Sequence, residues 1–289
     1  MAIKGVITLE LQLKARNLVI GGVARVNRYV DIENIKYPDG TPYIPGSSLK
    51  GRLRMLIEHA FGITQHASPD SVRKLTSDIH TKLRHGEAEN FTEELVKRLS
   101  ERENKGVDVR KIVHHLAFFE SLDGLGPTRL HFGDLVLDKS KPYSVEISAR
   151  NLINRYTGVA QHPRLIERIS GTFRGRLSIL IAEPELEGLK EDTQKKIKER
   201  LKDLYEANGG LMLLQRGFYM LKLLGIGRGV SRGNGRVEEV EARIVKVYPP
   251  IKLEGPKYSA KEADHVELRE GIEEMARRIL EEKKDERKL

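Results

Sequence analysis

Polar and apolar residues alternate along the start of the chain. Over residues 3–14 the aliphatic side chains fall on one side of an extended backbone, and polar or charged ones fall on the other. This period of two predicts a half-buried β-strand, followed by a short apolar run at 18–20 that ends at a glycine pair. Three later segments also predict strands: residues 129–138, 173–182 and 237–247.

A helical period begins after the turn at Pro45 and Gly46. From Ser48 to about Phe61 the aliphatic residues share one face of a helix. Ser47 or Ser48 can serve as its N-cap. The free amide groups and the positive end of the dipole at such a helix start attract anions. An ordinary capped helix with solvated charges is the alternative interpretation.

The rest of the pattern is mainly helical. Residues 64–120 carry helix formers and many charges, which predicts a helical insertion, whereas the polar and basic segment 144–171 predicts a protruding hairpin or loop. Three further helices are expected: a charged one over 190–208 ended by Gly209-Gly210, a more apolar one over 211–224, and a last one with a stripe of Leu268, Ile272, Met275 and Ile279 for docking.

The order of these elements predicts an α+β fold rather than a doubly wound sheet. A ferredoxin-like or RRM-like core is the natural candidate. We expect this core to comprise residues 1–63 and 121–250, with the helical insertion at 64–120 and a C-terminal helical extension at 251–289.

The charge balance predicts an anionic partner. Among 289 residues, 51 are Lys or Arg and 42 are Asp or Glu, which gives a net charge of +9. Between residues 207 and 237 several basic residues occur and no acid does. Basicity is thus concentrated in one part of the chain, as a surface that follows a phosphate backbone requires.

Composition also narrows the class of protein. Without cysteine, disulfides and thiolate metal sites are excluded, and no two histidines are four residues apart, so we expect no structural zinc. The sequence shows neither a membrane-spanning apolar run nor a signal-peptide core, so we expect a cytoplasmic protein without a membrane partner. A charged fraction of 32% without tryptophan fits a thermophile's surface of ion pairs.

The segment from Gly225 to Arg236 alternates five glycines with basic and small residues. It follows a helix and precedes a strand, the reverse of a Rossmann fingerprint, and no Gly-Lys-Ser/Thr closes it as in a Walker loop. Glycines let a backbone approach a ligand closely, and interleaved arginines favour phosphodiesters. A flexible hairpin is the alternative. We expect folding to bring this loop beside the helix start at 46–54.

Residues 44–51 and 231–237 together resemble the RAMP superfamily of CRISPR proteins. The resemblance is closest to the repeating backbone subunit of the type III-A (Csm) interference complex. Three more stretches match that subunit: Ile20–Gly22, Leu130–Leu135 in the form of its central strand, and Asn151–Thr157 with Pro163 and Glu167-Arg168 as its thumb. Many relatives have a histidine where this chain has Val19, which weakens any second RNA contact there.

The resemblance implies an RRM-like palm with lid and thumb elements. Its implied partners are a CRISPR guide RNA, a target single-stranded RNA, further copies of the chain in a filament and other type III-A subunits. The thumb at 144–171 would wedge between guide and target and displace a base pair at regular intervals, while base pairing supplies sequence specificity.

The residues implied to bind RNA fall in three groups. They are Gly46, Ser47, Ser48, Lys50, Arg52 and Arg54 at the helix start; Asn151, Asn154, Arg155, Arg164 and Arg168 in the thumb; and Gly227, Arg228, Gly229, Ser231, Arg232, Gly233 and Gly235 in the glycine-rich loop.

In the resembling subunits, an aspartate in the loop before Pro-Gly-Ser-Ser is required for cleaving target RNA. Asp39 is explained as a turn former within Pro38–Gly40. Asp31 lies at nearly the family's distance from Pro45 and is the catalytic candidate, with Glu33 in reserve. Asp31 would accept the proton of a ribose 2′-hydroxyl or hold a divalent ion such as Mg²⁺. Without the resemblance, a loop aspartate is a solvated or turn residue.

The leading hypothesis is therefore an endoribonuclease subunit of an RNA-guided complex. A non-catalytic RNA-binding scaffold or capping subunit of the same fold is the first alternative, and a guide-processing endonuclease that acts alone is the second. A generic basic protein of the translation machinery is the remaining one.

Overall fold

The computed structural model describes residues 2–21, 30–184, 186–250, 259–260 and 266–285. Its strands are β1 (Ala2–Leu18), β2 (Tyr43–Ile44), β3 (Leu130–Phe132), β4 (Leu135–Leu137), β5 (Ser144–Ile153), β6 (Ala160–Glu183), β7 (Arg236–Tyr248) and β8 (Ser259–Ala260). Its helices are α1 (Gly46–Ala60), α2 (Thr64–Ala67), α3 (Pro69–Arg84), α4 (Phe91–Glu103), α5 (Val109–Phe119), α6 (Glu191–Leu201), α7 (Leu211–Leu224) and α8 (Val266–Asp285).

One antiparallel sheet forms the centre of the molecule, in the order β2-β4-β6-β1-β7-β8. Its longest ladder pairs β1 with β6, from Ala2 opposite Glu183 to Leu18 opposite Ile169. The first crossover, from β1 to β3 and β4, contains α1, and the second, from β6 to β7, contains α7. This order of strands and helices is ferredoxin-like, so the predicted α+β palm is confirmed.

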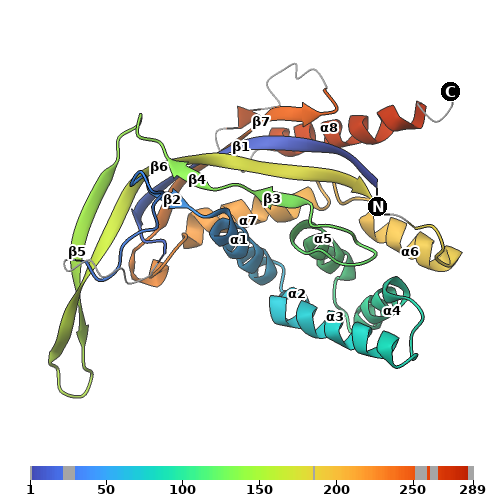
Figure 1. The fold of residues 1–289 in the computed structure, drawn as a ribbon, viewed down its shortest axis with the longest axis horizontal. Helices are drawn as coiled ribbons and strands as arrows, with labels where there is room; N and C mark the ends of the chain where they lie inside the picture. Colours follow the sequence, from blue (N-terminus) through green and yellow to red (C-terminus); the bar gives the residue numbers. More distant parts are fainter. Residues whose placement is uncertain (1, 22–29, 185, 251–258, 261–265, 286–289) are drawn as a thin grey trace.

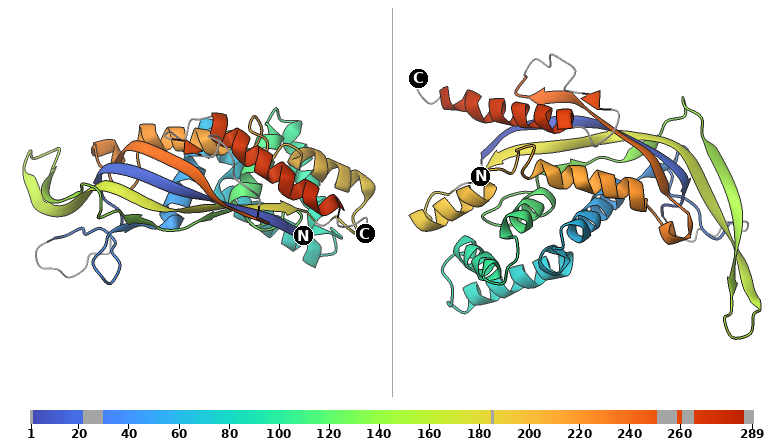
Figure 2. Two further views of the ribbon diagram at one scale, coloured as in Figure 1. Left: turned by 90° about the horizontal axis from the view of Figure 1, so that it is seen from above. Right: turned by 180° about the vertical axis from the view of Figure 1, so that it is seen from behind.

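Helices α1, α7 and α8 pack on the same face of this sheet (Figures 1 and 2). This face carries the buried aliphatic side chains of β1, and the buried residues of the three helices belong to one core. The predicted stripe of α8 is buried in the main core, with Met275 and Ile279 0% exposed. A Cβ added to Gly5 of β1 would lie only 2.7 Å from a methyl carbon of Ile279, so a glycine allows α8 to approach the strand closely.

Helices α2 to α5 form the group at the lower right of Figure 1. Their apolar faces meet in a hydrophobic cluster separate from the main core. Ser68, Asn90 and Asp108 cap α3, α4 and α5, since each side chain accepts a hydrogen bond from a first-turn amide. The helical character predicted for residues 64–120 is thus present.

β5 and the first half of β6 form a hairpin that projects beyond the palm (Figure 1). The ladder runs from Ser144 opposite Ser170 to Ile153 opposite Ala160. At the tip, the Asn154 side chain accepts a 2.8 Å hydrogen bond from the Tyr156 amide. A hairpin therefore occupies the segment for which the sequence predicts a hairpin or loop.

Two predicted helix boundaries are wrong. α1 begins at Gly46 with Pro45 at the N-cap and no side-chain cap, because the Ser48 amide already bonds the Pro45 carbonyl. Ser47 and Ser48 therefore lie inside the first turn. α6 ends at Leu201 rather than at the glycine pair; Gly210 instead donates a hydrogen bond to Asp203 in the turns that precede α7.

The strand predicted over 129–138 is divided into β3 and β4, because Gly133 and Asp134 leave the ladder between them. The stretch Leu130–Leu135 was expected to form the central strand, but the central strands of the sheet are β1 and β6.

The loop between the first strand and Pro45 lies partly outside the described residues, and so does the C-terminal extension. Gly22 lies outside them. Within the described part of the chain, no helix is long and apolar enough to cross a membrane.

Candidate nucleic-acid interface

The glycine-rich loop is fastened to the end of β1. The Arg228 amide donates to the Val19 carbonyl at 2.8 Å, and the Gly235 amide donates to Asn17 at 2.9 Å. Gly227 has φ of 93°, and a Cβ there would lie 2.5 Å from the Val19 oxygen, so only glycine allows this approach. The loop is thus a folded part of the palm, not a flexible hairpin.

Arg52 connects this loop to α1. Its Nε donates to the Gly225 carbonyl and its Nη2 to the Leu224 carbonyl, each at 2.8 Å. Burial lowers the pKa of Arg52. The two glycine-containing segments therefore lie side by side as expected, and Arg52 uses two of its donors to hold them there.

The start of α1 is less open to an anion than the sequence predicts. The Gly46 amide donates to Oδ1 of Asp134 at 2.8 Å, and Oδ2 of Asp134 accepts from the Tyr37 hydroxyl at 2.9 Å. The Gly46 amide already has an acceptor, because the protein supplies its own carboxylate there. Ser47 and Ser48 are exposed beside it.

The other cations of α1 also have partners. Lys50 Nζ lies 3.4 Å from the Thr128 hydroxyl, and burial lowers the pKa of Lys50. Arg54 pairs with Glu120 and lies 3.9 Å from Glu58. A phosphate at this helix would therefore compete with protein carboxylates.

A small cavity of about 160 Å³ lies where the hairpin meets the glycine-rich loop. Four arginines from the two elements line it, and none of the described residues in its wall is acidic. The wall is formed by Val19, Ile32, Arg150, Asn151, Arg164, Ile166, Arg228, Gly229, Arg232 and Asn234. Such a convergence of guanidinium groups favours an anionic ligand.

Two of these arginines face each other across the hairpin. Arg150 and Arg164 are directly opposite in the β5–β6 ladder, where like charges are destabilising. Burial, reinforced by Arg168 and Arg232, lowers the pKa of Arg150. The same region holds the buried Nε of Arg168, which has no hydrogen-bond partner within the described structure. An anion would relieve this repulsion.

Arg150 and Asn234 were not predicted from the sequence. Arg150 Nη2 donates to Asn234 Oδ1 at 2.6 Å, and Asn234 Nδ2 donates to the Arg228 carbonyl at 3.1 Å. Asn234 is 4% exposed. The pair joins the hairpin to the glycine-rich loop, and only the Asn234-Gly235 dipeptide within that loop could have indicated a fixed turn.

Asp31 does not line this cavity itself but directly precedes Ile32, which does. Its amide donates to the Leu165 carbonyl at 2.9 Å, and its Oδ2 accepts from the Leu165 amide at 2.6 Å. Asp31 is exposed and Glu33 is partly exposed. The candidate carboxylate thus stands beside the hairpin strand that carries Arg164.

The segment that follows Asp31 is anchored to β6. The Asn34 amide donates to Glu167 Oε2 at 2.9 Å, and Lys36 Nζ lies 2.6 Å from Glu167 Oε1. Asn34 Oδ1 accepts from the Ile20 amide at 2.7 Å. These bonds fix the position of the loop relative to both β1 and the hairpin.

The structure brings only some of the predicted RNA-binding residues together. Asn151, Arg164, Arg228, Gly229 and Arg232 share the cavity. Others lie apart from it: Asn154 and Arg155 at the hairpin tip, Ser231 and Gly233 on the exposed side of the loop, and the residues of α1.

The described residues contain no group of three His, Cys, Asp or Glu side chains that could hold a metal ion. Asp31 is thus not part of such a group, and its Oδ2 accepts from the Leu165 amide.

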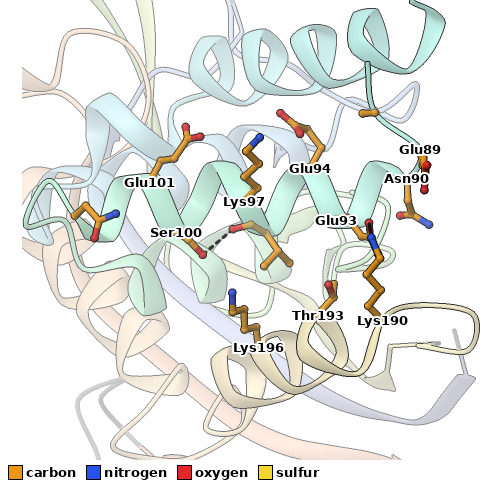
Figure 3. Close-up of a pocket in the computed structure, with 13 residues that line it drawn as sticks. Glu89, Asn90, Glu93, Glu94, Lys97, Ser100, Glu101, Lys190, Thr193 and Lys196 are labelled. Carbon is orange, nitrogen blue, oxygen red and sulfur yellow. Dashed lines mark hydrogen bonds and ion pairs between the residues drawn. The ribbon is translucent and has the colours of Figure 1, made fainter. Parts of the chain in front are cut away.

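A larger cleft of about 500 Å³ lies between α4 and α6 (Figure 3). Its charged residues are of both signs: Glu93, Glu94, Lys97 and Glu101 come from α4, and Lys196 comes from α6. Glu93 also pairs with Lys190 at 3.3 Å. Since these charges compensate one another, we place the candidate site at the smaller cavity.

A ferredoxin-like palm whose hairpin and glycine-rich loop enclose an arginine-lined cavity defines an α+β protein with a site for an anion. The sequence model of the RAMP superfamily matches residues 12–238. The chain therefore belongs to the RAMP superfamily, and the predicted resemblance to this family is confirmed.

Comparisons of whole chains find weaker likeness. No curated protein matches the sequence. A chain of the Type III-B Cmr-beta complex bound to cognate target RNA has 15% identity and a TM-score of 0.41, with 84% of this chain and 60% of that chain covered. A chain of the Csm3-Csm4 subcomplex of the type III-A CRISPR-Cas interference complex has 15% identity and a TM-score of 0.43, with 95% and 98% covered.

Proposed function

We propose that this chain is a guide-RNA-binding backbone subunit of a type III-A CRISPR effector complex that cleaves guide-paired target RNA. The observation that carries the proposal is the hydrogen bond between Asp31 and Leu165, which lies between Arg164 and Ile166 of the arginine-lined cavity. RAMP membership supports it. Its partners would be the guide RNA, the target RNA, further copies of the chain and other subunits of the complex.

The cavity supplies the binding step. Arg228 and Arg232 on the loop and Arg164 on the hairpin would hold phosphates of one strand. The Arg150–Asn234 pair keeps the two elements at a fixed separation, so the arginines are positioned before RNA arrives.

Cleavage requires that the RNA be held in the correct position and that one side chain act as a general base. RNA carries its own nucleophile, the 2′-hydroxyl. Asp31 would take the hydroxyl proton as the O2′–P bond forms and the P–O5′ bond breaks, and the leaving 5′-oxygen would take a proton from water. The products are a 2′,3′-cyclic phosphate and a 5′-hydroxyl. A divalent ion such as Mg²⁺ on Asp31, when bound, would neutralise charge on the phosphate.

Replacing Asp31 with Asn tests the catalytic step. The variant keeps an oxygen to accept the Leu165 amide but loses the negative charge. In a reconstituted complex we expect cleavage to fall by at least about 100-fold with target binding unchanged. Asp39→Asn is the matched control, since Asp39 is an exposed loop aspartate that only bonds Thr41. Cleavage at the normal rate in Asp31→Asn would refute the catalytic role.

A 2′-deoxy nucleotide at the scissile position tests the nucleophile. The deoxy target should bind and remain uncut, because the attacking hydroxyl is missing. A product from this substrate would exclude transesterification.

RNA binding is tested separately from cleavage. Arg228→Ala or Arg232→Ala should each lower the salt dependence of single-stranded RNA binding by about one unit of slope, as measured by fluorescence anisotropy. Arg278→Ala on α8 is the control, because Arg278 is exposed, pairs with Glu274 and does not line the cavity.

A non-catalytic scaffold or capping subunit is the second candidate. One observation favours it: the Asp31 carboxylate already fastens its loop to β6 through the Leu165 amide. A structural role predicts that Asp31→Ala lowers the stability of the protein. It also predicts that a complex reconstituted with Asp31→Asn cleaves target RNA at the normal rate. A guide-processing endonuclease would instead cut a hairpin repeat RNA as an isolated protein.

A further inference from the structure

The outer face of α7 carries a stripe of mainly apolar side chains that stays exposed to solvent in the described structure. Its members are spaced by four, three and four positions: Met212, Arg216, Tyr219 and Leu223. Because an α-helix has about 3.6 residues per turn, these side chains share one face, and other residues of α7 are buried in the main core. Tyr219 is 38% exposed and Leu223 is 61% exposed. Alternate spacings of three and four are typical of a helix that packs along a second helix.

A cavity of about 320 Å³ lies beside this stripe. Phe61, which ends α1, forms one part of its wall, and Met212, Gln215, Arg216 and Tyr219 of α7 form the rest. Two aromatic rings and a thioether make this lining largely apolar. Pockets of this kind receive an aromatic or aliphatic anchor side chain at protein interfaces.

The charge at this cavity is positive. Arg216 lies beside the Tyr219 ring, with its Cζ 5.9 Å from the ring centroid, and none of the described residues in the cavity wall is acidic. The Nζ of Lys111 lies 5.4 Å from the centroid of the Phe61 ring, but Asp108 already pairs with this lysine at 2.9 Å. Carboxylates on a docked partner would therefore complement Arg216.

A second copy of this chain is a poor occupant of the same face. Outside α7, the large apolar side chains that are exposed among the described residues lie on strands or in loops, so no other described helix offers a matching stripe. If two copies met through α7, a two-fold axis would bring both Arg216 side chains into one interface. Like charges in an interface oppose association.

We propose that the stripe on α7 and the cavity beside Phe61 bind an amphipathic helix of another protein. An apolar residue of that helix would fill the cavity, and its flanking carboxylates would face Arg216. This proposal goes beyond the proposed function, because it concerns a protein partner and does not require that the chain bind or cleave RNA.

A designed helical peptide of about three heptads tests the proposal on the full-length protein. The peptide is stapled on its outer face, with leucine at positions a and d and glutamate at e and g, where like charges keep it from pairing with itself. It should shift the methyl resonances of Met212 and Leu223 in NMR spectra and leave the exposed Ile147 of the hairpin unchanged. A peptide with lysine in place of glutamate should bind at least about tenfold more weakly at low salt, as measured by fluorescence anisotropy.

Variants at exposed positions locate the binding surface. Leu223→Glu places a carboxylate within the apolar stripe and should weaken binding of the glutamate peptide at least about tenfold. Val245→Glu, at a 39% exposed position on β7, is the matched control and should bind the peptide as the wild type does. Arg216→Ala should remove most of the preference for the glutamate peptide over the lysine peptide. Circular dichroism shows whether each variant folds.

The possible results separate this proposal from its competitors. Equal affinity for the two peptides, or no shift at Met212 and Leu223, would overturn it. Sedimentation that shows self-association of the wild type, lost in Leu223→Glu, would assign the face to a second copy instead. A shift of the same methyl groups by oligouridine would assign it to RNA, and either result would overturn the proposal.

RNA binding by the same proteins keeps the two functions apart. If the wild type bound single-stranded RNA but not the glutamate peptide, the docking site would be overturned and the proposed function would be unaffected. If the wild type bound the glutamate peptide at α7 but no RNA, the proposed function would fail and the docking site would be supported.

Discussion

The guanidinium group of Arg52, in the middle of α1, donates a 2.8 Å hydrogen bond to the carbonyl oxygen of Gly225, the residue that ends α7. A second bond of 2.8 Å reaches the Leu224 carbonyl. Carbonyls at a helix C-terminus lack partners within the helix and carry the negative end of its dipole. Arg52 therefore supplies hydrogen-bond donors to carbonyls at the C-terminus of α7 and fixes the start of the glycine-rich loop.

Replacing Arg52 with Ala should destabilise the protein by about 2 kcal/mol, since two half-buried carbonyls lose charged donors. Arg52→Lys should lose less but not recover fully, because an ammonium group cannot reproduce the forked geometry. Urea unfolding measures both. Arg16→Ala is the control: its side chain is 65% exposed and should change stability by less than about 0.5 kcal/mol. If Arg52→Ala also changed the free energy of unfolding by less than about 0.5 kcal/mol, water would be shown to replace the guanidinium group.

Regular patterns made much of the fold predictable. The alternation that begins near Ile7 predicted β1, and helical spacing predicted α1, α7 and the docking face of α8. The glycines at 225–235 indicated a tight loop. Each of these features is encoded within a dozen or so neighbouring residues, so local propensity and periodicity suffice to find it.

The cavity and the contacts at the start of α1 and the end of α7 depend instead on residues far apart in sequence. Asp134 bonds an amide 88 positions earlier in the chain, so nothing near Gly46 reveals that its amide is engaged. Arg150 and Asn234 are separated by 84 positions. In the sequence Arg150 is one more charge in a polar segment, and only the register of the hairpin places it opposite Arg164.

The Asp134 carboxylate gives a prediction about the start of α1. Asp134→Asn keeps an acceptor for the Gly46 amide but removes a negative charge from a helix N-terminus. We expect a loss of about 0.5–1 kcal/mol in stability. At low salt, affinity for single-stranded RNA should rise about two- to fivefold, because one repulsive charge beside the proposed phosphate path is gone.

Asp70→Asn, in the first turn of α3, provides the comparison. It removes the same charge from a different helix start, within the helices α2 to α5. RNA affinity should stay unchanged in this variant. Weaker RNA binding by Asp134→Asn than by the wild type would mean that the carboxylate organises the site instead of repelling the ligand.

Behind the same helix, Glu58 and His115 form a buried pair. Oε1 of Glu58 lies 3.5 Å from Nε2 of His115, and the side chains are 3% and 0% exposed. Burial raises the pKa of Glu58 to about 7; the nearby Arg54 opposes this and Glu120 adds to it. Burial also lowers the pKa of His115 to about 3. The interior therefore favours the neutral form of both groups.

The raised pKa of Glu58 means that the folded state binds its proton more tightly than the unfolded chain does. Ionisation of Glu58 should therefore withdraw stability as pH rises from about 4.5 to about 7, and the loss is complete above that range. Glu58→Gln stays neutral, so its stability relative to wild type should increase by about 1–3 kcal/mol between pH 5 and pH 8. Urea unfolding at both pH values measures this difference, in which the opposite titration of His115 largely cancels because both proteins contain it. Glu101→Gln is the control, as Glu101 is an exposed glutamate on α4. Parallel pH profiles for wild type and Glu58→Gln would show that Glu58 titrates as an ordinary carboxyl.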